Sequence, residues 1–592
     1  MCGIAGISSN KLDKNDVVKR VAKMQGALQH RGPDDSGEYR SPSHSTSLAH
    51  TRLSIIDLSA SGHQPMPSNC GRYVITFNGE IYNYQELRAL LESEGEIFQS
   101  HSDTEVILTL YIKYGEDCLS KLRGMFAFFI WDDENKCGFA ARDPLGIKPF
   151  YYYRNANTFA FASELRSLTD SCLFSNTLSA TGLFSYFKNG TCSEPNTLLD
   201  KAKMLKAGHS LKWNDGELQI NNYAKLDFSP SNIQHHEAIS ITREALKNSI
   251  KAHFVSDVPV GLFLSGGIDS TAILALAKQV SDTPIRTYSI AFEDPEWNEG
   301  DIAKRVADHF GSDHTELIMT KEIAQSLFSQ FLESIDQPTI DGFNTFCVAK
   351  LAHDNGEKVV LSGVGGDELF AGYKSFELIP KMVATSKAAK FLSPFLRYCS
   401  EKFNRFLSAK QRRVLDFMCS PGSSSAAHQS LRGIFSNTEA LALTNKYGLS
   451  APKKLKTDEI EANSILDSIS NLEITTYMRN QLLRDSDVMS MAWGLELRVP
   501  FVDFKLVQTL AKIPASIRLR QGKKLLIESV PEIPQWVIDR PKQGFRFPFD
   551  QWYSDSWSEQ NLSITPPSWI HLTPWYRRWS LVVLDGWIKR HN

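Results

Sequence analysis

The second residue of the chain is a cysteine, in the run Met1-Cys2-Gly3-Ile4. Its small side chain permits removal of the initiator methionine, which would leave Cys2 with a free α-amine. The thiolate is the reactive form of sulfur, and an α-amine that titrates near ~7.7 to 8.0 can take up the thiol proton at neutral pH. One residue would then supply a nucleophile and its base. Taken alone, Cys2 is more simply an accident of the translation start, so other motifs must decide.

A glycine turn in the second half of the chain follows an apolar, strand-like run and opens a helical pattern. The turn contains Leu264, Ser265, Gly266, Gly267, Asp269 and Ser270. Bare backbone N–H groups at the start of a helix favour a phosphate group. The lysine of a Walker loop is missing. A serine and two glycines are often only a tight connection, but the preceding strand and the two polar residues after them favour a phosphate site.

A second glycine cluster follows another strand-like run. It contains Ser362, Gly363, Val364, Gly366 and Asp367. Ligands of a parallel sheet bind at the carboxyl ends of its strands, so both turns are expected to open on one site. Asp269, in the first turn, is a carboxylate of the kind that Mg²⁺ prefers. Packing alone is a poor explanation for both clusters.

The elements before residue 223 are predicted to be those of a mixed α+β domain. Short apolar or alternating runs separated by turn formers predict strands, and Ser102 is a candidate N-cap for the last of three helical patterns. The predicted strands are residues 48–56, 73–77, 125–131, 138–142, 150–153 and 158–162, and the predicted helices are 16–29, 83–94 and 103–114.

After a polar linker at residues 229–232, strands and helices alternate, which is typical of a parallel sheet wrapped by helices. The predicted helices are 236–253, 270–280, 299–311 and 344–355, and the predicted strands are 260–264, 285–292, 315–319 and 358–361. From about Phe376 helical periodicity dominates, with segments near 475–491 and 504–510. The serine-rich residues 420–425 are predicted to form an exposed loop.

The composition limits the class of protein. A length of 592 residues predicts two domains or three. The net charge of −2, from 65 basic and 67 acidic residues, gives no field that would recruit nucleic acid or an anionic membrane. Nine cysteines without a C-x-x-C pair argue against a disulfide framework and a zinc site, and no apolar run approaches the roughly 18 residues of a membrane span. We therefore expect a cytoplasmic protein with small-molecule substrates, no nucleic acid and no membrane.

Motifs in order along the chain carry a resemblance to a known family. They are Cys2-Gly3-Ile4, His30-Arg31-Gly32-Pro33-Asp34, Arg52-Leu53-Ser54-Ile55-Ile56, Asn78-Gly79-Glu80-Ile81-Tyr82-Asn83, Ser102-Asp103-Thr104-Glu105, Arg142-Asp143-Pro144-Leu145-Gly146, the two glycine turns, and Glu496-Leu497-Arg498-Val499-Pro500-Phe501. From Cys2 to about Phe549 the chain resembles glutamine-hydrolysing asparagine synthetase, a class II glutamine amidotransferase fused to an ATP-pyrophosphatase-type synthetase.

The resemblance implies the fold and the domains. Residues 2–223 would form an α+β N-terminal-nucleophile (Ntn) hydrolase sandwich of αββα layers, the glutaminase domain. Residues 235–592 would form an α/β parallel-sheet ATP-pyrophosphatase domain with a helical C-terminal part, the synthetase domain. A homodimer is also implied.

The resemblance also assigns the glutamine site. Cys2 would be the nucleophile, Arg52 would pair with the α-carboxylate of glutamine in a forked geometry, and Asp103 would receive its α-ammonium. The Asn78 side chain and the Gly79 N–H would form the oxyanion hole, although Asn-Gly is also a common hairpin turn. The remaining glutamine-binding residues would be Leu53, Ser54, Ile55, Ile56 and Glu80.

In the second domain the resemblance assigns ATP and Mg²⁺ to the glycine turns. ATP would contact Leu264, Ser265, Gly266, Gly267, Asp269, Ser270, Ile290, Ser362 and Gly363, and the magnesium ligands would be Asp269 and Asp367. Lys542 would be catalytic by meeting the leaving pyrophosphate, although a lone lysine is more often a solvated surface charge. The block from Leu483 to Ala492, with Glu496 to Phe501, would help to build the acceptor pocket.

One position departs from the family pattern. Where the family usually places an acidic residue that assists adenylation of aspartate, this chain has Val364. Valine can neither accept a proton nor balance an ammonium, so either backbone and metal suffice or the acceptor differs. Gly366 and Ala371 are smaller departures.

The implied reaction joins two half-reactions. Cys2 would release ammonia from glutamine, ATP would adenylate aspartate to β-aspartyl-AMP, and ammonia reaching that intermediate through an internal tunnel would give asparagine, AMP, pyrophosphate and glutamate. The nearest alternative is the same chemistry on another carboxylate, such as a sugar uronate or a biosynthetic intermediate. A β-lactam-forming cyclase would not need the intact glutamine pocket, a glutamine phosphoribosyl transferase would lack the turn at residues 265–270, and an inactive binding or regulatory protein would tend to lose the nucleophile or that turn.

Overall fold

The computed structural model describes residues 2–281, 283–294, 297–388, 407–450, 463–541, 547–552 and 562–591. Its first part contains two six-stranded antiparallel sheets, with strand orders β10-β8-β9-β1-β3-β2 and β12-β11-β7-β6-β5-β4. The strands are β1 (Gly3–Ser9), β2 (Asp35–Arg40), β3 (Ser45–Arg52), β4 (Met66–Pro67), β5 (Tyr73–Ile81), β6 (Gly124–Asp132), β7 (Cys137–Arg142), β8 (Tyr151–Arg154), β9 (Thr158–Ala162), β10 (Ala202–Met204), β11 (His209–Asn214) and β12 (Glu217–Asn222).

Helices cover both outer faces of this pair of sheets. They are α1 (Lys14–Gly26), α2 (Tyr84–Ser93), α3 (Asp103–Tyr114) and α4 (Leu165–Asp170). A fifth helix, α5 (Ala180–Asn189), packs against the helix Asn437–Lys446 of the second part. α1 packs against β1 and β3 and against α4, whereas α3 packs against β5 and α2. The predicted αββα sandwich is therefore confirmed. The Ser102 side chain accepts a hydrogen bond from the N–H of Thr104 at the start of α3, as an N-cap does.

Strand β6 shows why the central strands are apolar on both sides. Side chains alternate across a strand, and Phe126, Phe128 and Ile130 pack in the core beneath α3. Ala127, Phe129 and Trp131 lie in the core between the two sheets. A strand in the middle of a four-layer sandwich has no face in water, so its sequence is a continuous hydrophobic run.

Asn78 and Gly79 do not form a hairpin turn. They lie inside β5, where Asn78 pairs with Ala127 and Gly79 with Phe126 of β6. The turn interpretation of this dipeptide is wrong, because a partner strand almost 50 residues away continues the ladder through both residues.

The second part is built on a five-stranded sheet of order β15-β14-β13-β16-β17, in which every neighbouring pair is parallel. The strands are β13 (Val260–Phe263), β14 (Arg286–Phe292), β15 (Asp313–Met319), β16 (Val359–Leu361) and β17 (Glu496–Arg498). The connecting helices are α6 (His235–His253), α7 (Ile268–Val280), α8 (Gly300–Phe310), α9 (Lys321–Ser334) and α10 (Phe343–Asp354). This confirms the predicted α/β sheet. Residues 223–234 between the two parts form no helix or strand, and the boundaries 2–223 and 235–592 stay a prediction.

The C-terminal part is helical, as predicted. Its helices are α11 (Gly366–Leu369), α12 (Ser375–Ala388), α14 (Ala409–Met418), α15 (Ser424–Arg432), α16 (Asn437–Lys446), α17 (Ile465–Leu472), α18 (Arg484–Met491), α19 (Phe504–Ala511), α20 (Ala515–Arg518), α21 (Lys524–Ser529), α22 (Gln535–Ile538), α23 (Phe549–Trp552) and α24 (Tyr576–His591). Between α17 and α18 the helix continues as a π-helix over Glu473–Leu483.

The serine-rich segment 420–425 is the predicted exposed loop only in part: residues 420–423 connect α14 to α15 and Pro421 is exposed, but the loop ends at Ser423. Ser423 caps α15 by accepting a hydrogen bond from the N–H of Ala426, and Ser424 and Ser425 form the first turn of the helix. Serine is a strong N-cap, and here that preference starts a helix whose Ala427 and His428 are buried.

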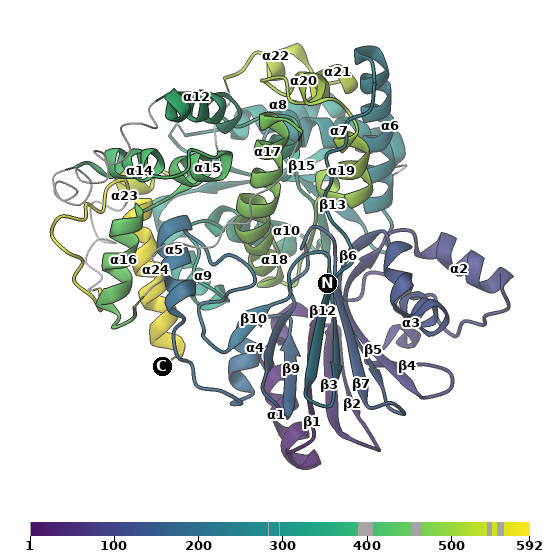
Figure 1. Cartoon of the computed structure of the whole chain (residues 1–592). Helices are drawn as coiled ribbons and strands as arrows, with labels where there is room; N and C mark the ends of the chain where they lie inside the picture. Colours follow the sequence, from purple (N-terminus) through teal and green to yellow (C-terminus); the bar gives the residue numbers. More distant parts are fainter. Residues whose placement is uncertain are drawn as a thin grey trace.

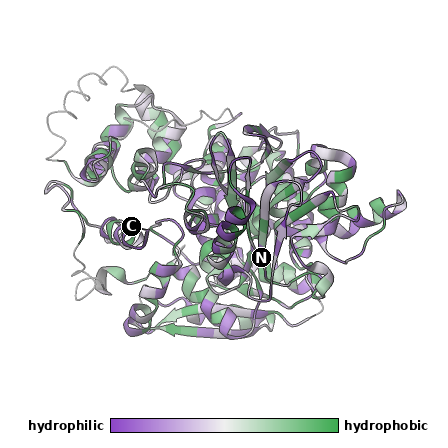
Figure 2. Ribbon diagram, turned by 90° about the horizontal axis from the view of Figure 1, so that it is seen from below, coloured by the Kyte–Doolittle hydropathy of each residue, from purple (hydrophilic) through white to green (hydrophobic). Residues whose placement is uncertain are grey.

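The two parts meet where the chain begins. Figure 1 shows the N-terminus at the junction between the antiparallel sheets and the α/β part, while α24 runs along one side of the molecule. In Figure 2 hydrophilic and hydrophobic segments alternate along the helices, as expected of helices with one buried face. Within the described ranges, the helices are too short or too polar to cross a bilayer.

Candidate functional site

Cys2 and Asn78 lie together at the junction. Cys2 is buried just before β1, and its N–H donates to Asn78 Oδ1 at 3.0 Å. The other end of that amide, Asn78 Nδ2, is buried and has no hydrogen-bond partner among the residues that the structure describes. Buried donors are almost always paired, so this one is available to a ligand oxygen. The arrangement fits the predicted nucleophile and oxyanion hole.

Gly79 is required by the strand geometry beside Asn78. Its φ is +153°, and a Cβ atom there would lie 2.1 Å from the carbonyl oxygen of Met125. A larger residue would push β5 away from β6 at the point where the Asn78 amide is held. Both the sequence motif and the tertiary packing therefore require glycine at position 79.

The environment of Cys2 favours the thiol over the thiolate. Burial raises the pKa of the Cys2 thiol, and the N–H of Leu53 and the Arg52 guanidinium oppose that effect only in part. Such a thiol needs a base close by. His50 does not suit that role, because burial lowers its pKa to about 3.

The predicted glutamine-binding segment lies beside Cys2. Arg52 ends β3, and its guanidinium is buried and donates to the carbonyls of Ser59 (3.0 Å) and Ile56 (3.3 Å), and to that of Asp57. Leu53, Ile55 and Ile56 are buried and Ser54 is half-buried. The guanidinium is thus held rigidly by backbone oxygens, and a ligand carboxylate would have to share its donors with that loop.

Two buried carboxyl groups, those of Asp103 and Glu80, belong to the predicted glutamine site. Asp103 is the first residue of α3 and accepts the Ile81 N–H at 2.9 Å, and burial raises its pKa to about 6. Burial also raises the pKa of Glu80, as does the neighbouring Glu496 carboxylate. Glu80 Oε2 lies 3.6 Å from Arg498 in β17, so a predicted glutamine-binding residue touches the edge of the second sheet.

The two glycine turns meet, as expected for turns at the carboxyl ends of strands in a parallel sheet. β13 and β16 are neighbours, Leu264 to Gly267 follow β13, and Ser362 and Gly363 follow β16. A Cβ on Gly366 would lie 2.4 Å from Asp269 Oδ1, so the second turn reaches the first residues of α7. A Cβ on Gly266 would lie 2.8 Å from Ile302. Glycine is needed at both positions for this close approach.

Residues around the first turn hold its shape. Ser265 N–H and Gly267 N–H are 3.3 and 3.4 Å from the hydroxyls of Ser270 and Ser265. Ile290 lies on β14, next to β13, and is buried. Lys542 falls outside the described residues, so its role stays a prediction.

A lysine that sequence analysis did not single out joins the two predicted magnesium ligands. Lys523 Nζ contacts Asp269 and lies 2.5 Å from Asp367 Oδ1. Burial alone would lower the pKa of Lys523, but Asp269 and Asp367 raise it. Lys523 is buried while Lys524 is exposed. Two adjacent lysines are equivalent in the sequence, so no signal there could have chosen the first.

The acids suit Mg²⁺ only with help from a ligand. Within the described ranges there is no group of three or more metal-binding side chains. Mg²⁺ commonly takes one or two carboxylates plus substrate phosphates, and Asp269 and Asp367 beside the first glycine turn fit that pattern.

Glu368 is a further site residue that sequence analysis did not predict. Burial and the neighbouring Asp367 raise its pKa to about 8, and Tyr373 donates to it at 2.9 Å.

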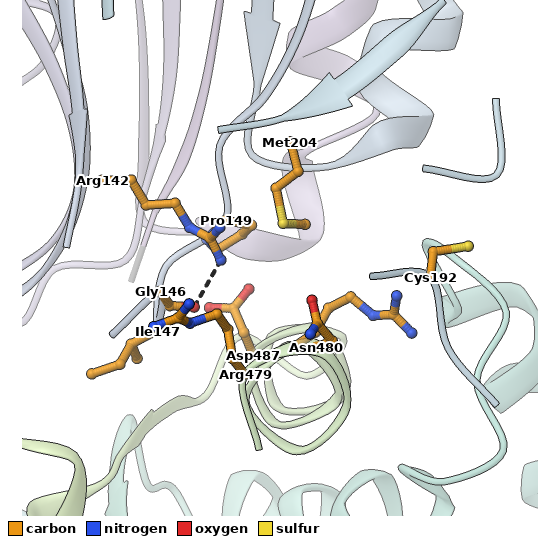
Figure 3. A pocket seen from close by; sticks show the side chains of 10 residues that line it. Arg142, Gly146, Ile147, Pro149, Cys192, Met204, Arg479, Asn480 and Asp487 are labelled. Carbon is orange, nitrogen blue, oxygen red and sulfur yellow. Dashed lines mark hydrogen bonds between the residues drawn. The ribbon is translucent and has the colours of Figure 1, made fainter. Parts of the chain in front are cut away.

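A small cavity of about 10 Å³ lies between the two parts. Figure 3 shows Arg479, Asn480 and Asp487 on the helix facing Arg142, Pro149 and Met204 of the first part. Such a volume holds about one water-sized molecule. Asn480 Oδ1 accepts the Glu194 N–H at 2.9 Å, so polar groups of both parts are paired around it.

Comparison with known proteins gives two family matches. Residues 1–224 match the glutamine amidotransferase domain and residues 242–566 match asparagine synthase. The chain is 33% identical to asparagine synthetase [glutamine-hydrolyzing] 1 of Bacillus subtilis (94% of this chain, 89% of that protein). It is 32% identical to asparagine synthetase B of Escherichia coli (69% and 71%), and 27% identical to amidase chry2 of Gibberella zeae (93% and 90%).

Proposed function

Because the chain belongs to the asparagine synthase family, with a glutamine amidotransferase domain at its N-terminal end, we propose that it makes asparagine from aspartate with glutamine as nitrogen donor. β-Aspartyl-AMP would be the intermediate, and AMP, pyrophosphate and glutamate would be the other products. The observation that carries this proposal is the pairing of Cys2 with Asn78, whose Nδ2 lacks a partner in the described part of the chain, together with two glycine turns that meet on a parallel sheet.

The glutaminase half-reaction follows from the residues around Cys2. Removal of Met1 would turn the Cys2 nitrogen, 3.0 Å from Asn78 Oδ1, into an α-amine that accepts the thiol proton. The thiolate attacks the carboxamide carbon of glutamine, and Asn78 Nδ2 with the Gly79 N–H stabilises the oxyanion. The C–N bond breaks as the amine returns its proton to the leaving ammonia, and water then hydrolyses the thioester to glutamate.

The synthetase half-reaction would use the two turns. Backbone N–H groups from Ser265 to Gly267 and the start of α7 would bind the ATP phosphates. The acceptor carboxylate attacks the α-phosphorus, pyrophosphate leaves, and ammonia then displaces AMP from the acyl-adenylate. When bound by Asp269 and Asp367, Mg²⁺ would neutralise phosphate charge. Lys523 holds these two carboxylates together before the nucleotide arrives.

Product analysis tests the proposal. The protein is incubated with ATP, magnesium, amide-labelled glutamine and a panel of acids that includes aspartate, and the products are identified by mass spectrometry. We expect labelled asparagine with AMP and glutamate, and no label transfer from the Cys2→Ala variant. If ATP/pyrophosphate exchange does not occur with aspartate but occurs with another acid, the aspartate assignment is rejected.

A second candidate keeps this chemistry and changes the acceptor. Val364 lies in the second turn and packs against the hydrophobic core beneath the sheet, so that position supplies no carboxylate to an amino-acid substrate. A relative of similar length is named an amidase rather than a synthetase. Transfer of label to a sugar uronate or another acid in the panel, with none to aspartate, would favour this candidate.

A further inference from the structure

Arg31 holds the backbone of the nucleophilic residue. It lies in the short 3-10 helix Gln29–Arg31 and is completely buried. Its Nε donates to the carbonyl oxygen of Cys2 at 3.1 Å, while Asn78 accepts the Cys2 N–H. Both polar backbone groups of Cys2 are therefore fixed, and the position of its Sγ atom depends on these two partners.

The guanidinium of Arg31 has its other two nitrogens on carboxylates of different parts of the chain. One Nη donates to Glu164 at 2.8 Å and the other donates to Asp487 at 2.9 Å. Glu164 follows β9 in the first part, but Asp487 is on α18, 456 positions away. The Arg31 and Glu164 side chains are fully buried and that of Asp487 is 3% exposed, so solvent screens these pairs little.

Helix α18 carries two acids that point to different partners. The Asp485 carboxylate accepts the Thr339 hydroxyl at 2.5 Å within the second part. The Asp487 carboxylate instead contacts the first part. It accepts a hydrogen bond from Arg31 and lies 3.8 Å from Lys148 Nζ. The sequence resemblance placed the block from Leu483 to Ala492 at the acceptor pocket. Asp487 of that block instead contacts Arg31, which donates to the carbonyl oxygen of Cys2.

We propose that Asp487 is a positioning residue of the glutaminase, which the other part of the chain supplies and which acts on Cys2 through Arg31. The inference rests on the proposed function. Without the Asp487 charge, Glu164 is the one carboxylate that Arg31 retains among the described residues, and Arg31 is drawn toward it, so its hydrogen bond to Cys2 lengthens. Small misplacements of reacting groups cost on the order of 10- to 100-fold in rate. Glutamine binding through Arg52 and Asp103 is untouched, so kcat changes and KM does not.

The test measures glutamate released from glutamine by the full chain and by the variants Asp487→Asn, Asp487→Glu and Arg31→Lys. Asp503→Asn is the matched control, because Asp503 also makes an ion pair across the two parts, with Arg123, and asparagine retains its N-cap of α19. Amidation from ammonium chloride, with the acid that the panel identifies, and the midpoint of thermal unfolding are measured in parallel.

We expect Asp487→Asn and Arg31→Lys to lower kcat on the order of 10- to 100-fold at constant KM, Asp487→Glu to restore most of it, and Asp503→Asn to match the wild type. Ammonium-dependent amidation should be retained in all four. A wild-type kcat for glutamate release in Asp487→Asn overturns the inference, as does a parallel loss of glutamate release and ammonium-dependent amidation. If Asp487→Asn does not fold, a wild-type kcat in Arg31→Lys overturns the inference. No glutamate from the wild type would reject the proposed function itself, and this inference with it.

Discussion

Replacing Asn78 by alanine removes two functions of one side chain from the glutamine site. Its Oδ1 accepts the Cys2 N–H, and its Nδ2 is a buried donor that has no partner within the described ranges. The first function holds the nucleophile in place. The second is available only to a ligand, and the developing oxyanion of a glutamine carboxamide is a ligand that would use it.

The two losses have different magnitudes for rate and for stability. Loss of one oxyanion donor typically lowers kcat by about 10² to 10³, or ~2.7 to 4 kcal/mol. For stability, loss of the hydrogen bond to Cys2 costs about 0.5 to 1.5 kcal/mol, whereas removal of an unpaired buried N–H relieves a penalty of about 1 to 3 kcal/mol. These stability terms oppose each other. We therefore expect a large fall in kcat with little change in the free energy of unfolding.

The assay is glutamate release under saturating glutamine, with thermal unfolding and ammonium-dependent amidation measured on the same samples. Thr76→Val is the matched control, since Thr76 is buried on the same face of β5 and its hydroxyl donates a long hydrogen bond, of 3.4 Å, to the carbonyl oxygen of Ala49. A kcat of Asn78→Ala equal to that of Thr76→Val would refute the oxyanion role. A fall in kcat that tracks a fall in the unfolding midpoint would show a structural role instead.

Three further predictions concern single residues. Asp103 must be ionised to receive an ammonium group, and because burial raises its pKa to about 6, KM for glutamine should rise as the pH falls through about 6; a KM that is flat from pH 5 to 8 would contradict this. Gly79→Ala should lower the midpoint of thermal unfolding, since backbone strain costs about 1 to 3 kcal/mol and the new Cβ would meet the Met125 carbonyl; an unchanged midpoint would show that β5 can adjust. Lys523→Met should destabilise the protein by about 3 to 5 kcal/mol, as for a broken buried ion pair. It should also abolish AMP formation but leave glutamate release intact. Lys524→Met, at an exposed position, should change neither the stability nor AMP formation.

Much of the fold follows from local patterns in the sequence. The apolar run of β6 predicts a strand buried on both faces, and Ser102 predicts the start of α3. Hydrophobic periodicity and capping are local properties, so they can be read from the sequence without knowing the tertiary contacts. The alternation of strands and helices after residue 235 likewise predicts the parallel sheet.

Predictions failed where distant partners decide the conformation. The Asn78-Gly79 dipeptide has a strong local preference for a hairpin, but pairing with β6 makes it part of a strand. Strand β17 is only Glu496–Arg498, too short to give a pattern, and it exists because β16 aligns it. At Ser424 the loop prediction failed for a local reason instead, because Ser423 caps a helix whose Ala427 is buried.

For the candidate sites, the sequence by itself determined the chemical types: a cysteine next to the start, an asparagine and glycine for an oxyanion, and two glycine turns with an aspartate each. Residue type and short spacing suffice for these because each acts through its own backbone or side chain. Only the tertiary structure decided which lysine joins Asp269 to Asp367, and that Arg31 links Cys2 to Asp487. Those contacts join residues from 29 to 456 positions apart in the sequence, and burial, which no local pattern specifies, gives the charges their strength.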